Sequence, residues 1–165
     1  MQEESKPAAP AGFSTTQIVL HWLIAALVGV QFLNHEAMEE WWRDATGGLP
    51  EPGPAMAHII AGTIVLVLML VRLAIRWRVG APAQPEDYSP LLTRASEWAH
   101  YALYGVMLLT PITGLTAVFV AAPVAEAHDV LTGVFLFLLA LHVLGALYHL
   151  IIRRDGVFKR IFVPR

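Results

Sequence analysis

The chain has 165 residues, of which 56% are hydrophobic, and its mean hydropathy is +0.57. Its apolar runs approach the about 20 residues that a membrane-spanning helix needs, which argues against an ordinary soluble domain and predicts a single integral membrane domain. There is no cysteine, so disulfides, iron–sulfur clusters and thioether-linked haem are excluded. The formal net charge of −2 decides little as a sum, and its distribution along the chain is more informative.

The N-terminal residues 1–13 are polar and rich in proline and alanine, so we expect a disordered tail. The tail has no basic n-region, and no A-x-A site follows the first apolar run, so a signal peptide is not predicted. Ser14 or Thr15 could cap the first helix. We expect four membrane-spanning helices, at residues 16–34, 55–77, 91–120 and 127–152.

The connections between these helices differ in composition. A polar loop is expected at 35–54, a proline-rich connector at 78–90 and a short turn at Pro123, and Pro111 should kink the third helix. The predicted architecture is an all-α, integral membrane four-helix bundle. Its domain spans residues 14–160, and 161–165 form a C-terminal tail.

The basic residues predict how the bundle is oriented. If the N-terminus, the connector between helices two and three and the C-terminus share one side, that side has ten basic residues and the other has only Arg43. The ten are Lys6, Arg72, Arg76, Arg78, Arg94, Arg153, Arg154, Lys159, Arg160 and Arg165. The positive-inside rule then predicts that both termini are cytoplasmic.

Histidines in the apolar segments are the main functional signal. His128 and His142 are fourteen residues apart, which is about 1400° of helix and a rise of about 21 Å, so both rings project from one face at different depths. In the predicted topology His21 matches the depth of His142, and His58 matches that of His128. A b-type haem needs two axial nitrogens from facing helices, and a bundle core with histidines at matching depths could supply them. Two histidine ligands would leave no site open for oxygen.

Other interpretations of these histidines stay open at this point. Each could be a packed, hydrogen-bonded histidine, although imidazole within lipid usually has a function. Zinc would need about four ligands gathered at one point, which the spread in depth disfavours. His100, near the start of the third helix, is the main rival to His142 as partner of His21. Small residues follow three of the histidines and would give a flat macrocycle clearance, and these are Gly62, Gly133 and Gly145.

Several stretches resemble the prokaryotic cytochrome b561 family. These are the opening STTQIVLHWL at 14–23, His58-x-x-x-Gly62, VLMLVRL at 67–73, PITGL at 111–115 and Leu141-His142. The resemblance extends over residues 13–160. It implies a bundle in the bacterial inner (plasma) membrane that holds two haems b, with His21, His58, His128 and His142 as the axial ligands of haem iron. It also implies electron exchange with quinone, and some members oxidise superoxide while reducing ubiquinone.

Two features depart from the members that use superoxide. The turn between helices three and four, 121–126, is short, and the predicted outer face is acidic. Its acidic residues are Glu36, Glu39, Glu40, Asp44, Glu51, Glu126 and Asp129, against Arg43 alone. This field would repel an anion such as superoxide and could attract a basic partner, for example a small electron-carrier protein.

Most of the remaining polar residues have both a functional and a structural interpretation. His149, two turns beyond His142, could contact a quinone carbonyl or relay a proton, or could simply face lipid headgroups. Arg72 and Arg76 could pair with haem propionates or reach toward lipid phosphates, and Arg72 is favoured because its position matches the family. His35 is expected to be solvated.

The functional prediction is a diheme b-type cytochrome that carries electrons between quinone and an outer-face donor or acceptor. Three alternatives are a superoxide:ubiquinone oxidoreductase, a cytochrome b subunit or anchor of a larger respiratory complex, and a haem-free membrane scaffold. Membrane lipid and quinone are expected partners, and nucleic acid is not. The sequence leaves open whether the chain is itself an enzyme.

Overall fold

A computed structural model describes residues 12–44, 48–85 and 88–165. The described residues form helices and no strands. The main helices are α1 (Thr15–Leu33), α2 (His35–Asp44), α3 (Pro54–Val79), α4 (Pro90–Phe119) and α5 (Ala125–Tyr148). Three short helical segments complete the chain, and these are η1 (Ala122–Val124), the π-helical η2 (His149–Arg153) and η3 (Phe158–Ile161).

Four helical segments are long and apolar enough to cross a membrane: α1, α3, α4 and the continuous stretch Ala122–Arg153 that contains α5. The all-α, four-span prediction is therefore confirmed. Large apolar side chains remain exposed along these helices, among them Val67, Leu70, Phe137 and Leu144. Such a surface is stable when lipid covers it, and helices satisfy their own backbone hydrogen bonds there.

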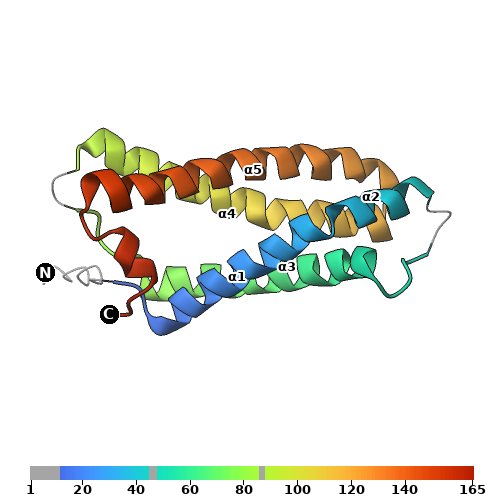
Figure 1. Ribbon diagram of the computed structural model, residues 1–165, viewed down its shortest axis with the longest axis horizontal. Coiled ribbons are helices and arrows are strands. Elements are labelled where there is room, and N and C mark those ends of the chain that lie inside the picture. The colour runs from blue at the N-terminus through green and yellow to red at the C-terminus, as the bar shows by residue number, and fades with distance from the viewer. Residues whose placement is uncertain (1–11, 45–47, 86–87) are drawn as a thin grey trace, which may run out of the picture.

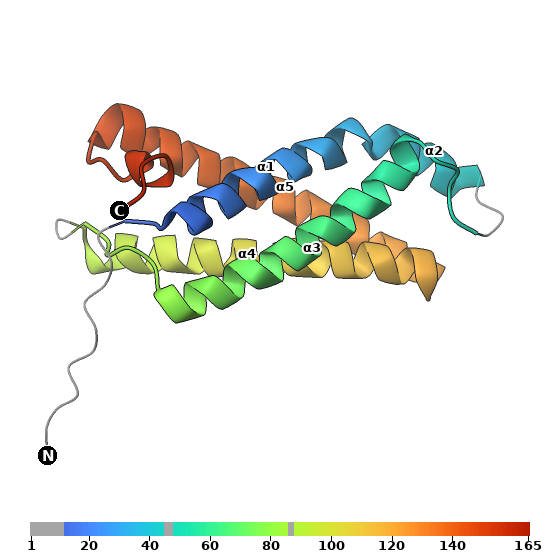
Figure 2. The same ribbon diagram turned by 90° about the horizontal axis from the view of Figure 1, so that it is seen from below.

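The helices pack as two pairs. α1 packs mainly on α3 and α4 on α5, and contacts between α3 and α4 join the pairs. Figures 1 and 2 show α2, the start of α3 and the start of α5 at one end of the bundle, which we call the α2 end, and the start of α1, the end of α3 and the C-terminus at the other, which we call the terminal end.

The predicted cap of the first helix is confirmed. Ser14 caps α1 in a capping box, in which its hydroxyl accepts from the Gln17 N–H and the Gln17 side chain accepts from the Ser14 N–H. α4 continues through Pro111 without a break, and the kink predicted there stays a prediction.

The expected polar loop at 35–54 is wrong in its first half, because residues 35–44 form α2. The local sequence of residues 35–44 is compatible with a helix at the end of the bundle. Glu36 is in the first turn and Arg43 in the last, which suits the helix dipole, and His35 pairs with Glu39 one turn later at 3.2 Å.

The interior core is small and lies midway along the bundle. Ile24, Val65 and Met69 are buried against one another, and Tyr104 and Met107 of α4 pack on them. Ile24 is nearly one turn beyond His21, and Val65 is two turns beyond His58. The core therefore separates two polar regions, one toward each end of the bundle.

Hydrogen bonds between distant segments close the terminal end. Gln17 is buried and donates to the Gly80 carbonyl at 3.1 Å, which joins α1 to the end of α3. The Trp22 indole N–H donates to the Ile161 carbonyl at 3.0 Å, and the Arg165 N–H donates to the Phe13 carbonyl at 3.1 Å. The C-terminal segment is thereby fixed against the start of α1.

Candidate functional site

The four intramembrane histidines of the sequence prediction form two facing couples. The His21 ring of α1 lies 6.3 Å from the His142 ring of α5, centroid to centroid, with an interplanar angle of 57°. The His58 ring of α3 lies 6.5 Å from the His128 ring of α5, at 75°. We call these the terminal pair and the α2-end pair. α5 contributes one member to each, as the fourteen-residue spacing predicts.

The spacing within each pair suits an ion held between the rings. Two metal–imidazole bonds of about 2 Å each, together with the distance from each ring nitrogen to its ring centre, add up to about 6 Å. Direct ring packing alone does not require both pairs to share this separation. The residues present therefore fit a b-type haem with two histidine ligands at each position.

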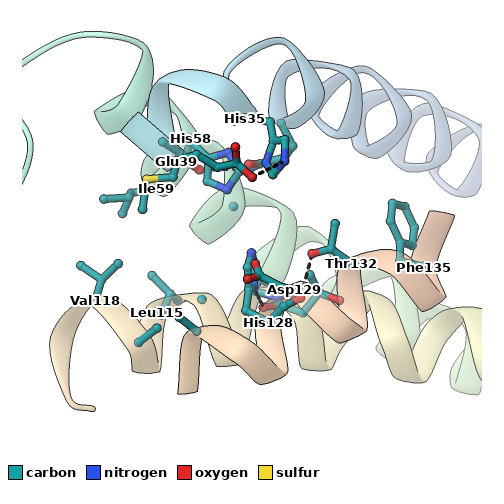
Figure 3. Close-up of a pocket in the computed structure, with 18 of the residues that line it drawn as sticks. His35, Glu39, His58, Ile59, Leu115, Val118, His128, Asp129, Thr132 and Phe135 are labelled. Atoms are coloured by element: carbon teal, nitrogen blue, oxygen red, sulfur yellow. Dashed lines mark hydrogen bonds and ion pairs between the residues drawn. The ribbon is translucent and has the colours of Figure 1, made fainter. Parts of the chain in front are cut away.

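A cavity of about 600 Å³ contains the α2-end pair. Figure 3 shows His58 and His128 on opposite walls of this cavity, with His35 and Glu39 of α2 beside His58. Most of the lining is apolar, and the volume is within the range of about 300–1,000 Å³ that cofactor sites occupy. α2 therefore forms part of a cofactor-sized cavity, a role that a loop prediction could not suggest.

Two features of α4 orient His128. The His128 Nδ1 lies 2.8 Å from the Thr110 carbonyl, which can only accept, so Nδ1 carries the hydrogen and Nε2 stays available as a ligand. Gly114 lies against the ring, and a Cβ at that position would be 2.9 Å from the His128 Cε1. Any larger residue at 114 would push on the ring.

The glycines expected to clear a macrocycle have different surroundings. A Cβ on Gly62 would meet the Gln31 side chain at 3.2 Å, whereas Cβ atoms on Gly133 and Gly145 would meet no atom within 4 Å. Gly114, in the PITGL stretch, is the glycine in contact with a paired histidine ring, and only the packing of α4 on α5 reveals that role.

Arg72 lies beside the terminal pair. Its guanidinium donates to the Gln17 carbonyl at 2.8 Å and to the Tyr104 hydroxyl at 3.3 Å, and one nitrogen is 3.4 Å from the His21 Nδ1. These partners keep the cation inside the bundle rather than at lipid headgroups. Arg76 lies over the Tyr104 ring, 5.5 Å from its centroid. Pairing of either arginine with a propionate stays a prediction.

His100 is a third imidazole near the terminal pair. Its ring is 5.5 Å from the His142 ring and nearly perpendicular to it, and its Nδ1 lies 2.7 Å from the Ser96 carbonyl. It therefore packs edge-on against His142, whereas His142 has the wider, haem-like separation from His21.

His149 belongs to a polar cluster that sequence inspection missed. Its Nδ1 is 2.8 Å from the Asp155 Oδ2, and the Tyr88 hydroxyl lies 2.8 Å from the same nitrogen and donates to Asp155 at 3.0 Å. The Tyr88 and His149 rings are stacked, 5.7 Å apart. Tyr88 is 61 residues from His149, so no local pattern could have identified it. The quinone contact predicted for His149 stays a prediction.

The Asp155 carboxylate is held in its charged form. Burial by itself raises the pKa of Asp155, but hydrogen bonds from His149, the Val157 N–H and Tyr88 outweigh burial and hold the pKa below its usual value. A carboxylate with a lowered pKa stabilises the folded chain above its usual pKa of about 3.9, and this contribution is lost as the pH falls through the folded-state pKa.

Asp155→Asn is therefore expected to lower the thermal midpoint of the purified protein at pH 7 by a few degrees, and to flatten the acid dependence below about pH 4. Thermal unfolding at a series of pH values, followed by circular dichroism, measures both effects. Equal midpoints for both proteins at pH 7 would show that the cluster does not fix the end of α5.

Comparisons with known proteins agree with this geometry. The family model described as prokaryotic cytochrome b561 matches residues 12–164. Cytochrome b562 of Cereibacter sphaeroides is 34% identical over 160 residues, which cover 93% of this chain and 97% of that protein. The probable superoxide oxidase CybB of Yersinia pestis is 25% identical (90% of this chain, 94% of that protein), and cytochrome b561 homolog 1 of Escherichia coli is 26% identical (93% and 97%). Since the family match spans nearly the whole chain, the protein belongs to the prokaryotic cytochrome b561 family of membrane haem b cytochromes.

Proposed function

We propose that this cytochrome holds two haems b, one between His21 and His142 and one between His58 and His128, and carries electrons across the membrane. The observation that carries the proposal is the pair of matching ring separations, 6.3 and 6.5 Å, on opposite sides of a buried apolar core. Haem iron with two histidine ligands gives and takes single electrons and has no free position for oxygen.

The chain's own residues have three tasks in this proposal. The four imidazoles hold the cofactor, and Thr110 fixes which nitrogen of His128 is available. Ile24, Val65 and Met69 keep water out of the region between the pairs. Arg72 supplies a positive charge beside the terminal pair, where it would pair with the carboxylates of the cofactor.

The proposed orientation places the terminal end in the cytoplasm and the chain in the bacterial inner membrane. This orientation is supported by the positive-inside rule, because ten basic residues belong to the side of the terminal end and only Arg43 to the other. Quinone would exchange electrons at the terminal end, where His149 lies in a polar cluster within the span of α5 and η2. The proposed domain remains 14–160, with tails at 1–13 and 161–165.

A haem count tests the proposal directly. Pyridine haemochrome analysis of purified protein is expected to give two haems b per chain, and a redox titration should resolve two midpoints. Addition of reduced ubiquinone should reduce the haems. A count of one, or none after expression with ample haem, would contradict the proposal, and none would favour the haem-free scaffold.

The acidic α2 end favours a basic electron-carrier protein as the second partner. Seven exposed carboxylates gather there against Arg43, and these are Glu36, Glu39, Glu40, Asp44, Glu51, Glu126 and Asp129. Glu39 and Asp129 also line the cavity of the α2-end pair, so the charged face and the cofactor site are continuous. Superoxide oxidation is a weaker proposal, because this field repels an anion, although one relative carries that name.

The rate of electron exchange with a basic c-type cytochrome is expected to fall about tenfold when the ionic strength rises from about 0.01 M to about 0.15 M. Salt screens the attraction between the basic protein and the acidic α2 end. The double variant Glu36→Lys, Glu40→Lys should be slow even at low salt. Stopped-flow absorption measures both rates. If superoxide instead reduces the protein at a near-diffusional rate, and the basic cytochrome reacts slowly at all salt concentrations, the superoxide alternative is correct.

A further inference from the structure

Two buried polar atoms near the α2-end pair lack a hydrogen-bond partner. Within the described residues, the His58 Nδ1 and the Gln31 Oε1 are the buried side-chain atoms in this condition. The His58 Nδ1 carries a hydrogen when Nε2 of the same ring binds a metal, and the Gln31 Oε1 is a hydrogen-bond acceptor. Both residues line the same cavity. Unsatisfied buried polar atoms are uncommon in proteins, so a complementary couple in one cavity calls for a physical reason.

The Gln31 side chain is already directed at the His58 turn of α3. Its Nε2 donates to the His58 main-chain carbonyl at 3.1 Å, which assigns the nitrogen to that contact and leaves Oε1 free to accept. Gly62, one turn after His58, leaves the space that this side chain fills, because a Cβ there would lie 3.2 Å from Nε2. Gln31 is thus held over His58 by α3 itself.

His128 shows what the second nitrogen of a ligand normally does. Its Nδ1 has the Thr110 carbonyl at 2.8 Å, whereas the His58 Nδ1 has no such bond. A histidine that binds a metal almost always donates its other N–H to an acceptor, which fixes the ring and raises its basicity. His58 therefore needs an acceptor in the loaded protein, and Gln31 has an unused one.

We propose that Gln31 is the positioning residue of His58, with its Oε1 accepting the Nδ1 hydrogen when Nε2 binds haem iron. This rests on the proposed function, because it requires His58 to be a ligand. The acceptor makes the imidazole a better donor to the iron, which favours the ferric state and lowers the midpoint potential. The Gln31 main-chain carbonyl is the competing acceptor, because it also interacts with the His58 ring, although without a hydrogen bond of good geometry to Nδ1.

The test replaces the side chain and keeps the main chain. Gln31→Leu is expected to raise the midpoint of the α2-end haem by about 59 mV, an about tenfold change in its reduction equilibrium, and to leave the other midpoint unchanged. Gln31→Glu keeps an acceptor oxygen and should hold the midpoint at or below the wild-type value. Thr132→Val is the matched control and should leave both midpoints unchanged. Its hydroxyl also lines the cavity and donates to a histidine main-chain carbonyl, that of His128 at 2.9 Å, and not to a ring nitrogen.

Redox titration and low-temperature electron paramagnetic resonance of the ferric protein are the readouts. An unshifted midpoint in Gln31→Leu would assign the main-chain carbonyl as acceptor and overturn the proposal, as would the same rise in Gln31→Glu. His58→Ala separates this failure from failure of the proposed function. If His58→Ala still binds two haems, His58 is not a ligand. If it loses one while Gln31→Leu is silent, only the role of Gln31 is wrong.

Discussion

Replacing His142 by alanine is expected to remove one of the two haems and leave the other in place. The two histidines of α5 are separated by about 21 Å of helix, so a lost ligand at the terminal pair should not disturb His58 and His128. Purified His142→Ala should contain about one haem per chain and show one midpoint. His58→Ala should also retain one haem, and its single midpoint should be the one that His142→Ala has lost.

Two further histidine variants complete this experiment. His35→Ala changes an exposed histidine that pairs with Glu39, and it should keep both haems. His100→Ala tests whether His100, and not His142, is the ligand opposite His21. It should keep both haems, because the His100 ring packs edge-on against His142. Loss of a haem in His100→Ala together with two haems in His142→Ala would transfer the ligand role to His100.

Gly114→Val is expected to remove the haem of the α2-end pair. A Cβ at position 114 would lie 2.9 Å from the His128 Cε1 and 3.0 Å from its Nδ1, so the ring must turn or α4 must move away. Turning the ring also breaks the hydrogen bond to the Thr110 carbonyl. Metal sites lose about 10–100-fold in affinity when such outer partners are lost, and a displaced ligand costs more.

The haem count and the two midpoints of Gly114→Val measure this effect. Gly105→Ala is the matched control, because it lies on the same helix and its Cβ would meet no atom within 4 Å. Gly114→Val should keep the haem of the terminal pair, which shows that the chain still folds. A variant with two haems and unchanged midpoints would mean that His128 is not a ligand or that α4 yields freely at this point.

Much of the architecture could be predicted because a membrane helix is a local structure. A run of about 20 apolar residues is sufficient to predict a span, so the four spanning segments agree with the sequence within a few residues. Helical periodicity and rise are equally local, which is why the fourteen residues between His128 and His142 predicted two sites at different depths. The outcome for residues 35–44 was different, because a polar stretch can be a loop or a surface helix until its packing is known.

Hydropathy and helix geometry are sufficient to predict a membrane helix bundle with four histidines at two depths, because both are properties of single segments. The packing of the helices was needed to show that Gly114 lies against the His128 ring, that Gln31 reaches the His58 turn, and that Tyr88 and Asp155 meet at His149. Most of these contacts join different helices or connections. They depend on how each helix is rotated and how closely its neighbour approaches, which no single segment encodes.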